Sequence, residues 1–181
     1  MGSMMERKVP LCIPDIGDAE VEAAAAVLRS GWLAHGPMNQ EFEKLFAQFV
    51  GVPHAVSLNS CASALHLAIL ASGIKGEIIL PSFTFVASAN AVVTGGARCV
   101  FADIDYATCC VDPAHVAALV TPRTEAIMPV HYGGQAADMA ALSGLAQKHG
   151  LKIIEDSAEA IGATCAGTMT GAWGIGCWSF Y

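Results

Sequence analysis

The segment 56–65 (VSLNSCASAL) has the residue types of an anion-binding turn. An apolar stretch leads into Asn59 and Ser60 and then into an apolar run long enough for a helix. The first backbone N–H groups of a helix have no partner within it, and together with small hydroxyls they can bind a phosphate. The alternative is that Asn59 or Ser60 only caps the helix. The segment matches neither the Walker phosphate loop nor the G-x-G-x-x-G dinucleotide fingerprint.

The segment 152–160 (KIIEDSAEA) ends a buried strand in two acids, Glu155 and Asp156, and Glu159 follows three residues later. In open α/β sheets, ligands bind at the carboxyl ends of the strands. A carboxylate there requires a cation or a set of hydrogen-bond donors, and the protonated ring nitrogen of a cofactor is one such cation. The alternative is a structural acid that caps the following helix.

Aromatic and hydroxyl side chains follow two further apolar stretches. Residues 81–85 (PSFTF) come directly after a predicted strand. An aromatic ring there could stack on a heteroaromatic ligand, although Phe in such a place is more often plain core. The glycine-rich residues 167–176 lead into 178–181 (WSFY), which place a hydroxyl in an apolar strand. Together the four segments predict one crevice with an anion site, a stacking ring and an acid.

Strands and helices must alternate to bring these segments together. We expect strands at 54–58, 77–80, 98–102, 126–130, 152–155 and 177–181. We expect helices at 18–29, 40–49, 62–72, 88–94, 113–119 and 139–149. Most of the strands are continuous apolar runs, which is typical of a parallel sheet covered by helices on both faces. The predicted fold class is therefore α/β, in one domain with a mainly parallel sheet and helices on both faces.

The composition excludes several classes of protein. The 181 residues include 9 Lys and Arg against 16 Asp and Glu, and 54% of them are apolar. This composition is unlike a disordered chain, and no nucleic-acid partner is expected because such readers need a basic surface. The charge-free stretches 45–74, 78–97 and 160–181 are each interrupted by Pro, Asn or Gly. We therefore expect no membrane span.

The cysteines and the two ends of the sequence carry further expectations. Seven cysteines, an odd number without a C-x-x-C pair, predict free thiols in a reducing cytoplasm and no metal site. Residues 1–4 (MGSM) look like the remnant of an expression tag, and 1–12 are interpreted as this remnant and an N-terminal arm. The apolar residues 177–181 have no polar cap after them, so we expect the N-terminal part of a longer protein.

The motifs resemble, in the same order, those of the DegT–StrS nucleotide-sugar aminotransferases. These are fold-type I enzymes that use pyridoxal 5'-phosphate (PLP). The resemblance implies that residues 13–181 are the N-terminal portion of a PLP-dependent transferase domain, similar to the large domain of fold-type I. The matching segments are 13–17, 30–37, 59–68, 81–90, 101–105, 121–124, 129–135, 154–162 and 176–181.

The resemblance implies a role for each matching cofactor residue. Ala62 and Ser63 would hold the cofactor phosphate through their backbone amides, and Ser179 would add a hydroxyl. Many relatives have Thr at the position of Ala62, so one hydroxyl contact is absent here unless Ser63 supplies it.

The resemblance also assigns the ring of the cofactor and the rim of the substrate site. Phe85 would stack on the pyridine ring, and Asp156 would pair with the ring nitrogen and keep it protonated. Glu159 would lie near the phenolic oxygen of the ring. Trp32 and His131 would lie at the rim of the substrate site.

The Schiff-base lysine of the family lies about three residues beyond the S-F-Y motif, which corresponds to a position past Tyr181. The five lysines of the sequence occur in other contexts. We therefore expect no catalytic residue within residues 1–181, and the sequence is expected to be truncated before that lysine.

The function implied by the resemblance is that of a PLP-dependent aminotransferase. It would move an amino group, with glutamate as the expected donor, to a keto sugar carried by a nucleotide, and it would act as a homodimer with shared active sites. One alternative is a deoxy-sugar dehydratase of the same family, in which histidine replaces the lysine and the pyridoxamine form (PMP) is used. Another is a binding or assembly module without catalysis.

Overall fold

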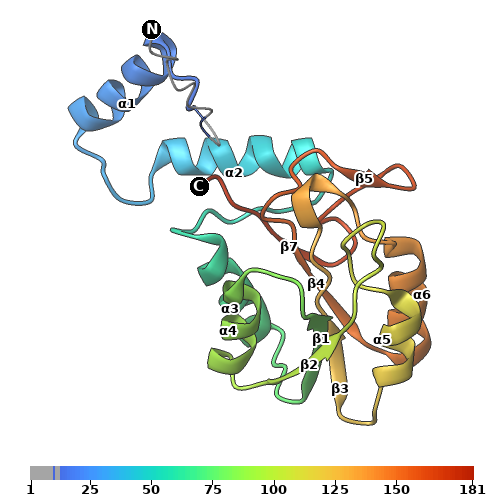
Figure 1. The fold of residues 1–181 in the computed structure, drawn as a ribbon. Helices are drawn as coiled ribbons and strands as arrows, with labels where there is room; N and C mark the ends of the chain where they lie inside the picture. Colours follow the sequence, from blue (N-terminus) through green and yellow to red (C-terminus); the bar gives the residue numbers. More distant parts are fainter. Residues whose placement is uncertain (1–9, 11–12) are drawn as a thin grey trace, which may run out of the picture. The chain divides into compact units, whose positions relative to one another are not determined.

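The computed structural model describes Pro10 and residues 13–181 (Figure 1). The predicted tag remnant and N-terminal arm fall almost entirely outside these described residues. The chain forms two compact units, residues 1–42 and 43–181. The sheet of the predicted α/β domain lies in the second unit.

The first unit contains α1 (Asp18–Ser30) and the beginning of α2 (Pro37–Val50). The N-cap of α1 is Gly17, whose backbone N–H donates to the Glu20 carboxylate at 2.8 Å. Gly31 ends the helix with a φ of 72°, a left-handed conformation that glycine adopts without strain.

The second unit contains a five-stranded parallel sheet in the order β2-β1-β3-β4-β7. A short antiparallel pair, β5 and β6, lies outside it. The strands are β1 (Glu77–Pro81), β2 (Arg98–Ala102), β3 (Thr124–Ile127), β4 (Lys152–Asp156), β5 (Thr164–Cys165), β6 (Thr168–Met169) and β7 (Ile175–Cys177). The helices are α3 (Cys61–Ala71), α4 (Val86–Thr94), α5 (Pro113–Leu119), η1 (Tyr132–Gly134) and α6 (Met139–His149).

Both faces of the sheet are covered, as the continuous apolar strands predicted. Ile78 packs in a core cluster with residues of α3 and α4, whereas the next residue, Ile79, packs with residues of α5 and α6. In Figure 1 these two helix pairs lie on opposite sides of the sheet. Because successive side chains of a strand point to opposite faces, an entirely apolar strand is what such a double layer requires.

Two of the predicted strands were wrong. Residues 54–58 form no strand, and Val56 is 75% exposed. The backbone N–H and the hydroxyl of Ser57 instead donate to the Glu43 carboxylate at 2.7 and 2.9 Å. At the end of the sequence, β7 stops at Cys177, and the segment 178–181 is irregular.

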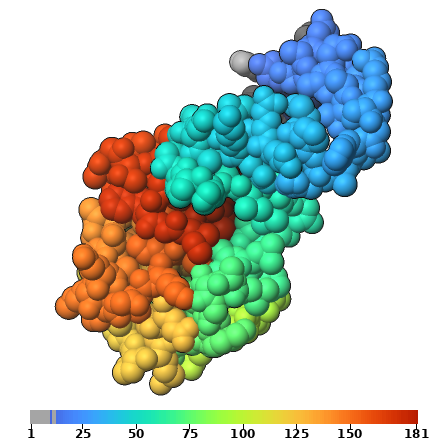
Figure 2. Space-filling model, turned by 180° about the vertical axis from the view of Figure 1, so that it is seen from behind, coloured from blue at the N-terminus to red at the C-terminus, as the bar shows by residue number. Residues whose placement is uncertain are grey.

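The end of α2 and the last residues of the chain lie side by side (Figure 2). The Phe46 ring meets the rings of Trp178 and Phe180 edge to face, with ring centroids 5.0 and 5.3 Å apart. Such pairs contribute about 0.5–1.5 kcal/mol beyond the area they bury. The segment 178–181 is therefore fixed by aromatic packing rather than by strand pairing.

Glu77 is a buried acid at the amino-terminal end of β1. Its carboxylate accepts hydrogen bonds from the Thr121 hydroxyl at 2.7 Å and from Nε of Arg123 at 3.0 Å. The hydrogen bond from Thr121 and the neighbouring Arg123 guanidinium hold the pKa of the Glu77 carboxyl below its ordinary value.

This lowered pKa predicts a stability that depends on pH. A lowered pKa in the folded state gives a stabilisation that is fully present above the unfolded-state pKa of about 4.3 and is lost as the pH falls through the folded-state pKa. Glu77→Gln is therefore expected to flatten the acid-side loss of stability, measured as urea midpoints at a series of pH values. Parallel curves for the two proteins would contradict this.

Candidate functional site

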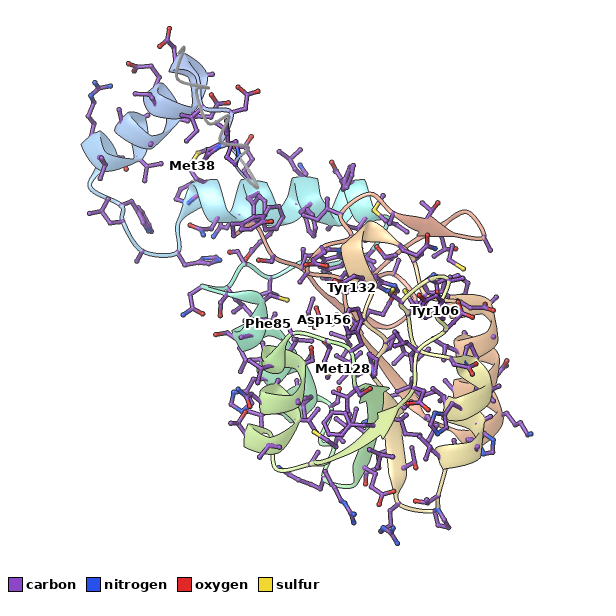
Figure 3. All side chains as sticks on the ribbon, in the orientation of Figure 1. Met38, Phe85, Tyr106, Met128, Tyr132 and Asp156 are labelled. Atoms are coloured by element: carbon purple, nitrogen blue, oxygen red, sulfur yellow. The ribbon has the colours of Figure 1, made fainter. Side chains whose placement is uncertain are left out.

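Three of the predicted segments meet at the carboxyl-terminal edge of the sheet. Strands β1, β4 and β7 run parallel in one sheet, so the residues that follow them emerge at the same edge. Asp156 ends β4, residues 82–85 follow β1 and residues 178–181 follow β7. The fourth segment joins them because α3 packs against both β4 and β7. Figure 3 labels Phe85 and Asp156 at this edge.

Asp156 is a buried carboxylate without a strong cationic partner. It is 5% exposed, and within the described residues no lysine or arginine forms an ion pair with it. Oδ2 accepts from the Ser88 hydroxyl at 2.7 Å, and Oδ1 accepts from the backbone N–H of Ala158 at 3.3 Å. Burial raises the pKa of the Asp156 carboxyl despite these hydrogen bonds. The site therefore favours a ligand that brings a positive charge to this carboxylate.

Ser88 is a site residue that the sequence reasoning missed. It lies in the first turn of α4, is fully buried, and has its hydroxyl 2.7 Å from both Asp156 and the Thr84 hydroxyl. The Ser88 hydroxyl has one hydrogen to donate, to Asp156 or to Thr84. A hydrogen bond to a carboxylate is stronger than one to a hydroxyl, so Ser88 donates to Asp156 and Thr84 donates to Ser88. Its only signal in the sequence is a hydroxyl among the apolar residues of a predicted helix.

The turn at the start of α3 both caps the helix and leaves free donors. The Ser60 hydroxyl oxygen accepts from the backbone N–H of Ser63 at 3.2 Å and lies 3.0 Å from the Ser63 hydroxyl. The capping interpretation of Ser60 is thus confirmed. Within the described chain, the backbone N–H groups of Cys61 and Ala62 have no acceptor. These two amides and the Ser63 hydroxyl are donors at the positive end of the helix, where an anion can bind.

Phe85 is an exposed residue at the N-cap of α4, the helix whose Ser88 contacts the buried acid. It is 77% exposed, so the alternative that it belongs to the core is wrong. Its backbone carbonyl lies 3.1 Å from the Ser88 hydroxyl, which also contacts Asp156. A large exposed aromatic ring at this edge of the sheet can stack on a flat ligand.

Glu159 and Ser179 lie on segments that follow the same strand ends. The exposed Glu159 carboxylate accepts from the backbone N–H of Gly133 at 2.8 Å, which ties this segment to η1. The Ser179 hydroxyl is half-buried and accepts from the backbone N–H of Tyr181 at 3.2 Å. Both side chains keep unused hydrogen-bonding capacity.

The two residues predicted at the rim of the substrate site lie in different units, so the structure tests the prediction for His131 and not the one for Trp32. His131 is 1% exposed, and both of its ring nitrogens are bonded within the protein, to Glu155 and to the backbone of Ala137. The His131 ring is therefore buried against Glu155 and does not lie at a rim. Trp32 belongs to the first unit, where it is exposed and its ring N–H donates to the His35 carbonyl at 3.2 Å.

Metal-binding clusters and membrane-spanning helices are both absent from the described residues. They contain no group of three or more His, Cys, Asp or Glu side chains arranged to hold a metal ion. None of their helices combines the length and the apolar character that crossing a membrane requires.

The sequence model of the DegT/DnrJ/EryC1/StrS aminotransferase family matches residues 14–181. The chain belongs to this family. The resemblance seen in the ordered motifs is thereby confirmed.

Comparison with a similar protein shows what share of a relative's length this chain covers. It is 47% identical over 176 residues to the spore coat polysaccharide biosynthesis protein SpsC of Bacillus subtilis (strain 168), and the match covers 96% of this chain and 45% of SpsC. The chain thus spans about half the length of the curated relatives that it matches.

Solved structures of family members share the fold. DesV of S. venezuelae is 42% identical, with a TM-score of 0.85 over 90% of this chain and 45% of DesV. The putative sugar aminotransferase Spr1654 of Streptococcus pneumoniae, in its PMP form, is 29% identical, with a TM-score of 0.92 over 97% of this chain and 49% of that protein. The predicted fold class, an α/β fold like the large domain of fold-type I PLP-dependent transferases, is confirmed.

Proposed function

We propose that this chain forms the cofactor-binding part of a PLP-dependent aminotransferase. The enzyme transfers an amino group from glutamate to a keto sugar carried by a nucleotide. The observation that carries the proposal is the buried Asp156, whose pKa is raised and which has no lysine or arginine partner in the described chain. Membership of an aminotransferase family and the likeness to a sugar aminotransferase in its PMP form support it.

The phosphate of the cofactor fits the turn at the start of α3. The free amides of Cys61 and Ala62 and the hydroxyl of Ser63 offer donors to an anion, and Ser179 offers a further hydroxyl. The Ser63 amide is bonded to Ser60, so we propose that Ser63 acts through its side chain. This side chain replaces the hydroxyl that is absent at Ala62.

Phe85 and Asp156 would hold the ring of the cofactor. When bound, PLP supplies an electron sink for the bond that breaks next to the transferred nitrogen. Asp156 keeps the proton on the ring nitrogen, and Ser88 orients the carboxylate through its hydrogen bond at 2.7 Å. Phe85 would stack on the ring and would exclude water from Asp156. Glu159, whose carboxylate accepts from the backbone N–H of Gly133, would lie near the phenolic oxygen.

We propose that the Schiff-base lysine follows Tyr181 in the full-length protein. Lys152 opens β4 while Asp156 ends it, which separates their Cα atoms by about 13 Å at the rise of a strand. The Lys152 ammonium donates to the Ser72 carbonyl. The Lys75 ammonium donates to the Gly95 carbonyl at 3.1 Å. Neither of these lysines faces Asp156.

We also propose a homodimer with shared active sites, located in the cytoplasm. Apolar side chains around the site, including Val56, Leu58 and Val86, are exposed in the single chain, and a second subunit would cover them. All six cysteines of the described residues are free thiols, which suits a reducing compartment. A molar mass from light scattering at twice the mass of the subunit is the expected result.

The function is tested on the full-length protein loaded with PLP. Addition of glutamate should release one equivalent of 2-oxoglutarate per bound cofactor and leave PMP in the site. A nucleotide-linked keto sugar should then take up the amino group and regenerate PLP. Loss of water from a deoxy-sugar without amine transfer would identify the dehydratase instead. A folded protein that binds neither form of the cofactor would support the module without catalysis.

A further inference from the structure

Glu155 is a fully buried carboxylate for which the proposed function has no role. Its side chain accepts four hydrogen bonds. Three come from backbone N–H groups of one glycine-rich turn, those of Gly171 at 2.7 Å, Trp173 at 2.8 Å and Gly174 at 2.9 Å. The fourth comes from Nε2 of His131 at 3.1 Å. With four donors, each oxygen of the buried Glu155 carboxylate accepts two hydrogen bonds, so the carboxylate is fully hydrogen-bonded within the protein.

The hydrogen bonds of His131 determine the direction of this network. Nδ1 of His131 lies 3.1 Å from the backbone nitrogen of Ala137, which can only donate. Nδ1 is therefore the acceptor, and the ring proton sits on Nε2, from which it is donated to Glu155. His131 thus donates through Nε2 and supplies the fourth hydrogen bond to the Glu155 carboxylate.

The turn that Glu155 holds forms a slot for an indole ring. The Trp178 ring lies directly on the backbone of Gly171 and Gly176, and a Cβ atom at either glycine would collide with it. Gly171 also has a φ of 82°, which L side chains rarely adopt. Trp178 is the residue before Ser179, so the position of the indole sets where the Ser179 hydroxyl emerges.

We infer that Glu155 is a positioning residue for the cofactor phosphate. It fixes the turn 171–174, the turn fixes Trp178 in its glycine slot, and Trp178 presents the Ser179 hydroxyl to the phosphate site. The inference rests on the proposed function, because that function assigns Ser179 to the phosphate. The two adjacent acids of β4 thus have different roles. Asp156 would bind the cofactor ring, and Glu155 fixes the turn 171–174.

Replacing the carboxylate by an amide breaks this arrangement. Glu155→Gln has one acceptor oxygen and an NH₂ group that is only a donor, while the turn and His131 present donors alone. At least one backbone N–H of the turn must then face another donor. The side-chain volume is nearly unchanged, so the variant tests the charge and its hydrogen bonds and not the packing.

The test compares two ligands on the full-length protein. The dissociation constants of PMP and of pyridoxamine, which lacks the phosphate, are measured by titration together with tryptophan fluorescence. Glu155→Gln should raise the dissociation constant of PMP at least about tenfold, the scale of one lost charge-assisted hydrogen bond, and leave that of pyridoxamine unchanged. The tryptophan emission should shift as Trp178 leaves its slot.

The matched control is Glu77→Gln. Glu77 is a buried acid of the same sheet with side-chain donors of its own, but it lies at the opposite end. This variant should change stability and leave the affinity ratio of the two ligands as it is in the wild type. A folded Glu155→Gln protein with the wild-type ratio would overturn the inference.

A second variant decides the case in which Glu155→Gln does not fold. Gly171→Ala keeps the carboxylate and displaces the indole from its slot, so it should show the same phosphate-selective loss. An unchanged ratio in Gly171→Ala would overturn the inference. A wild-type protein that binds neither ligand would instead refute the proposed function and the role of Glu155 in it.

Discussion

Asp156→Asn in the full-length protein is expected to bind the cofactor and to lose activity by about 10²–10³-fold, the usual effect of removing one preorganised electrostatic contact. The amide keeps the shape of the side chain and a hydrogen bond to Ser88, whose hydroxyl lies 2.7 Å from the carboxylate. It removes the charge that holds the proton on the ring nitrogen, and an unprotonated ring is a weaker electron sink. The phosphate turn at Ala62 and Ser63 is untouched and should retain the cofactor.

The stability of the cofactor-free protein separates this role from a structural one. Burial raises the pKa of the Asp156 carboxyl in the folded state, so its ionisation is a cost that is absent below the unfolded-state pKa and grows as the pH rises through the folded-state pKa. At neutral pH, Asp156→Asn should therefore match or exceed the melting temperature of the cofactor-free wild type. An acid with a purely structural role would give a lower melting temperature and little specific loss of turnover.

Cofactor occupancy, melting temperature and turnover are measured on the same preparation of Asp156→Asn. Near-normal turnover in a folded, loaded variant would remove Asp156 from the proposed site. Glu77→Gln again serves as the control, because it changes a buried acid of the same sheet far from the strand ends.

Ser63→Asp is expected to weaken PMP binding by at least about two orders of magnitude. Two unit charges about 4 Å apart repel by about 4 kcal/mol near a protein surface, and 1.4 kcal/mol corresponds to about a tenfold change in affinity. Ser63 is the third residue after the N-cap of α3, a position where an acid stabilises a helix by about 0.3–1 kcal/mol. The variant should therefore fold as well as the wild type while rejecting the phosphate.

Pyridoxamine provides the internal control for Ser63→Asp, since without a phosphate its affinity should stay near the wild-type value. Ala141→Asp provides the matched variant, because Ala141 is the third residue after the N-cap of α6. It should bind PMP normally. Equal losses of affinity for both ligands in Ser63→Asp would show that α3 does not hold the phosphate.

The sequence predicted the elements that depend on local pattern. The helices Pro113–Leu119 and Met139–His149 match their predicted ranges, and the other helices differ at their ends by up to three residues. Each has an apolar run of helical length between polar or glycine residues, so local signals suffice. Residues 54–58 show the limit of this reasoning. Their apolar pattern suits a strand, but strand formation also needs a neighbour, and Ser57 is bonded to a carboxylate of α2 instead.

The part of the candidate site that follows from the order and direction of the strands was predictable. Parallel strands bring their carboxyl ends together, so Asp156 and Phe85 could be placed at one edge from the sequence alone. The partners of these residues could not be predicted, because Ser88 and the turn 171–174 reach β4 through tertiary contacts. His131 was misplaced for the same reason. A histidine that follows a strand looks the same in a sequence whether it faces a substrate or a buried acid.

Because Glu155 and Asp156 point to opposite faces of β4, both can fill their roles in only one pairing register of the strand. Glu155 pairs in register with Gly176, and Asp156 pairs with Cys177. A slip by one residue would exchange every side chain between the two faces. With one residue inserted before β4, each residue would move one place along the strand. Glu155 would then take the place of Asp156 in the cofactor crevice, and the apolar Ile154 would face the four donors. A single-residue insertion between α6 and β4 is thus a more damaging change than most substitutions within the strand, because it disables the ring site and the phosphate site in one step.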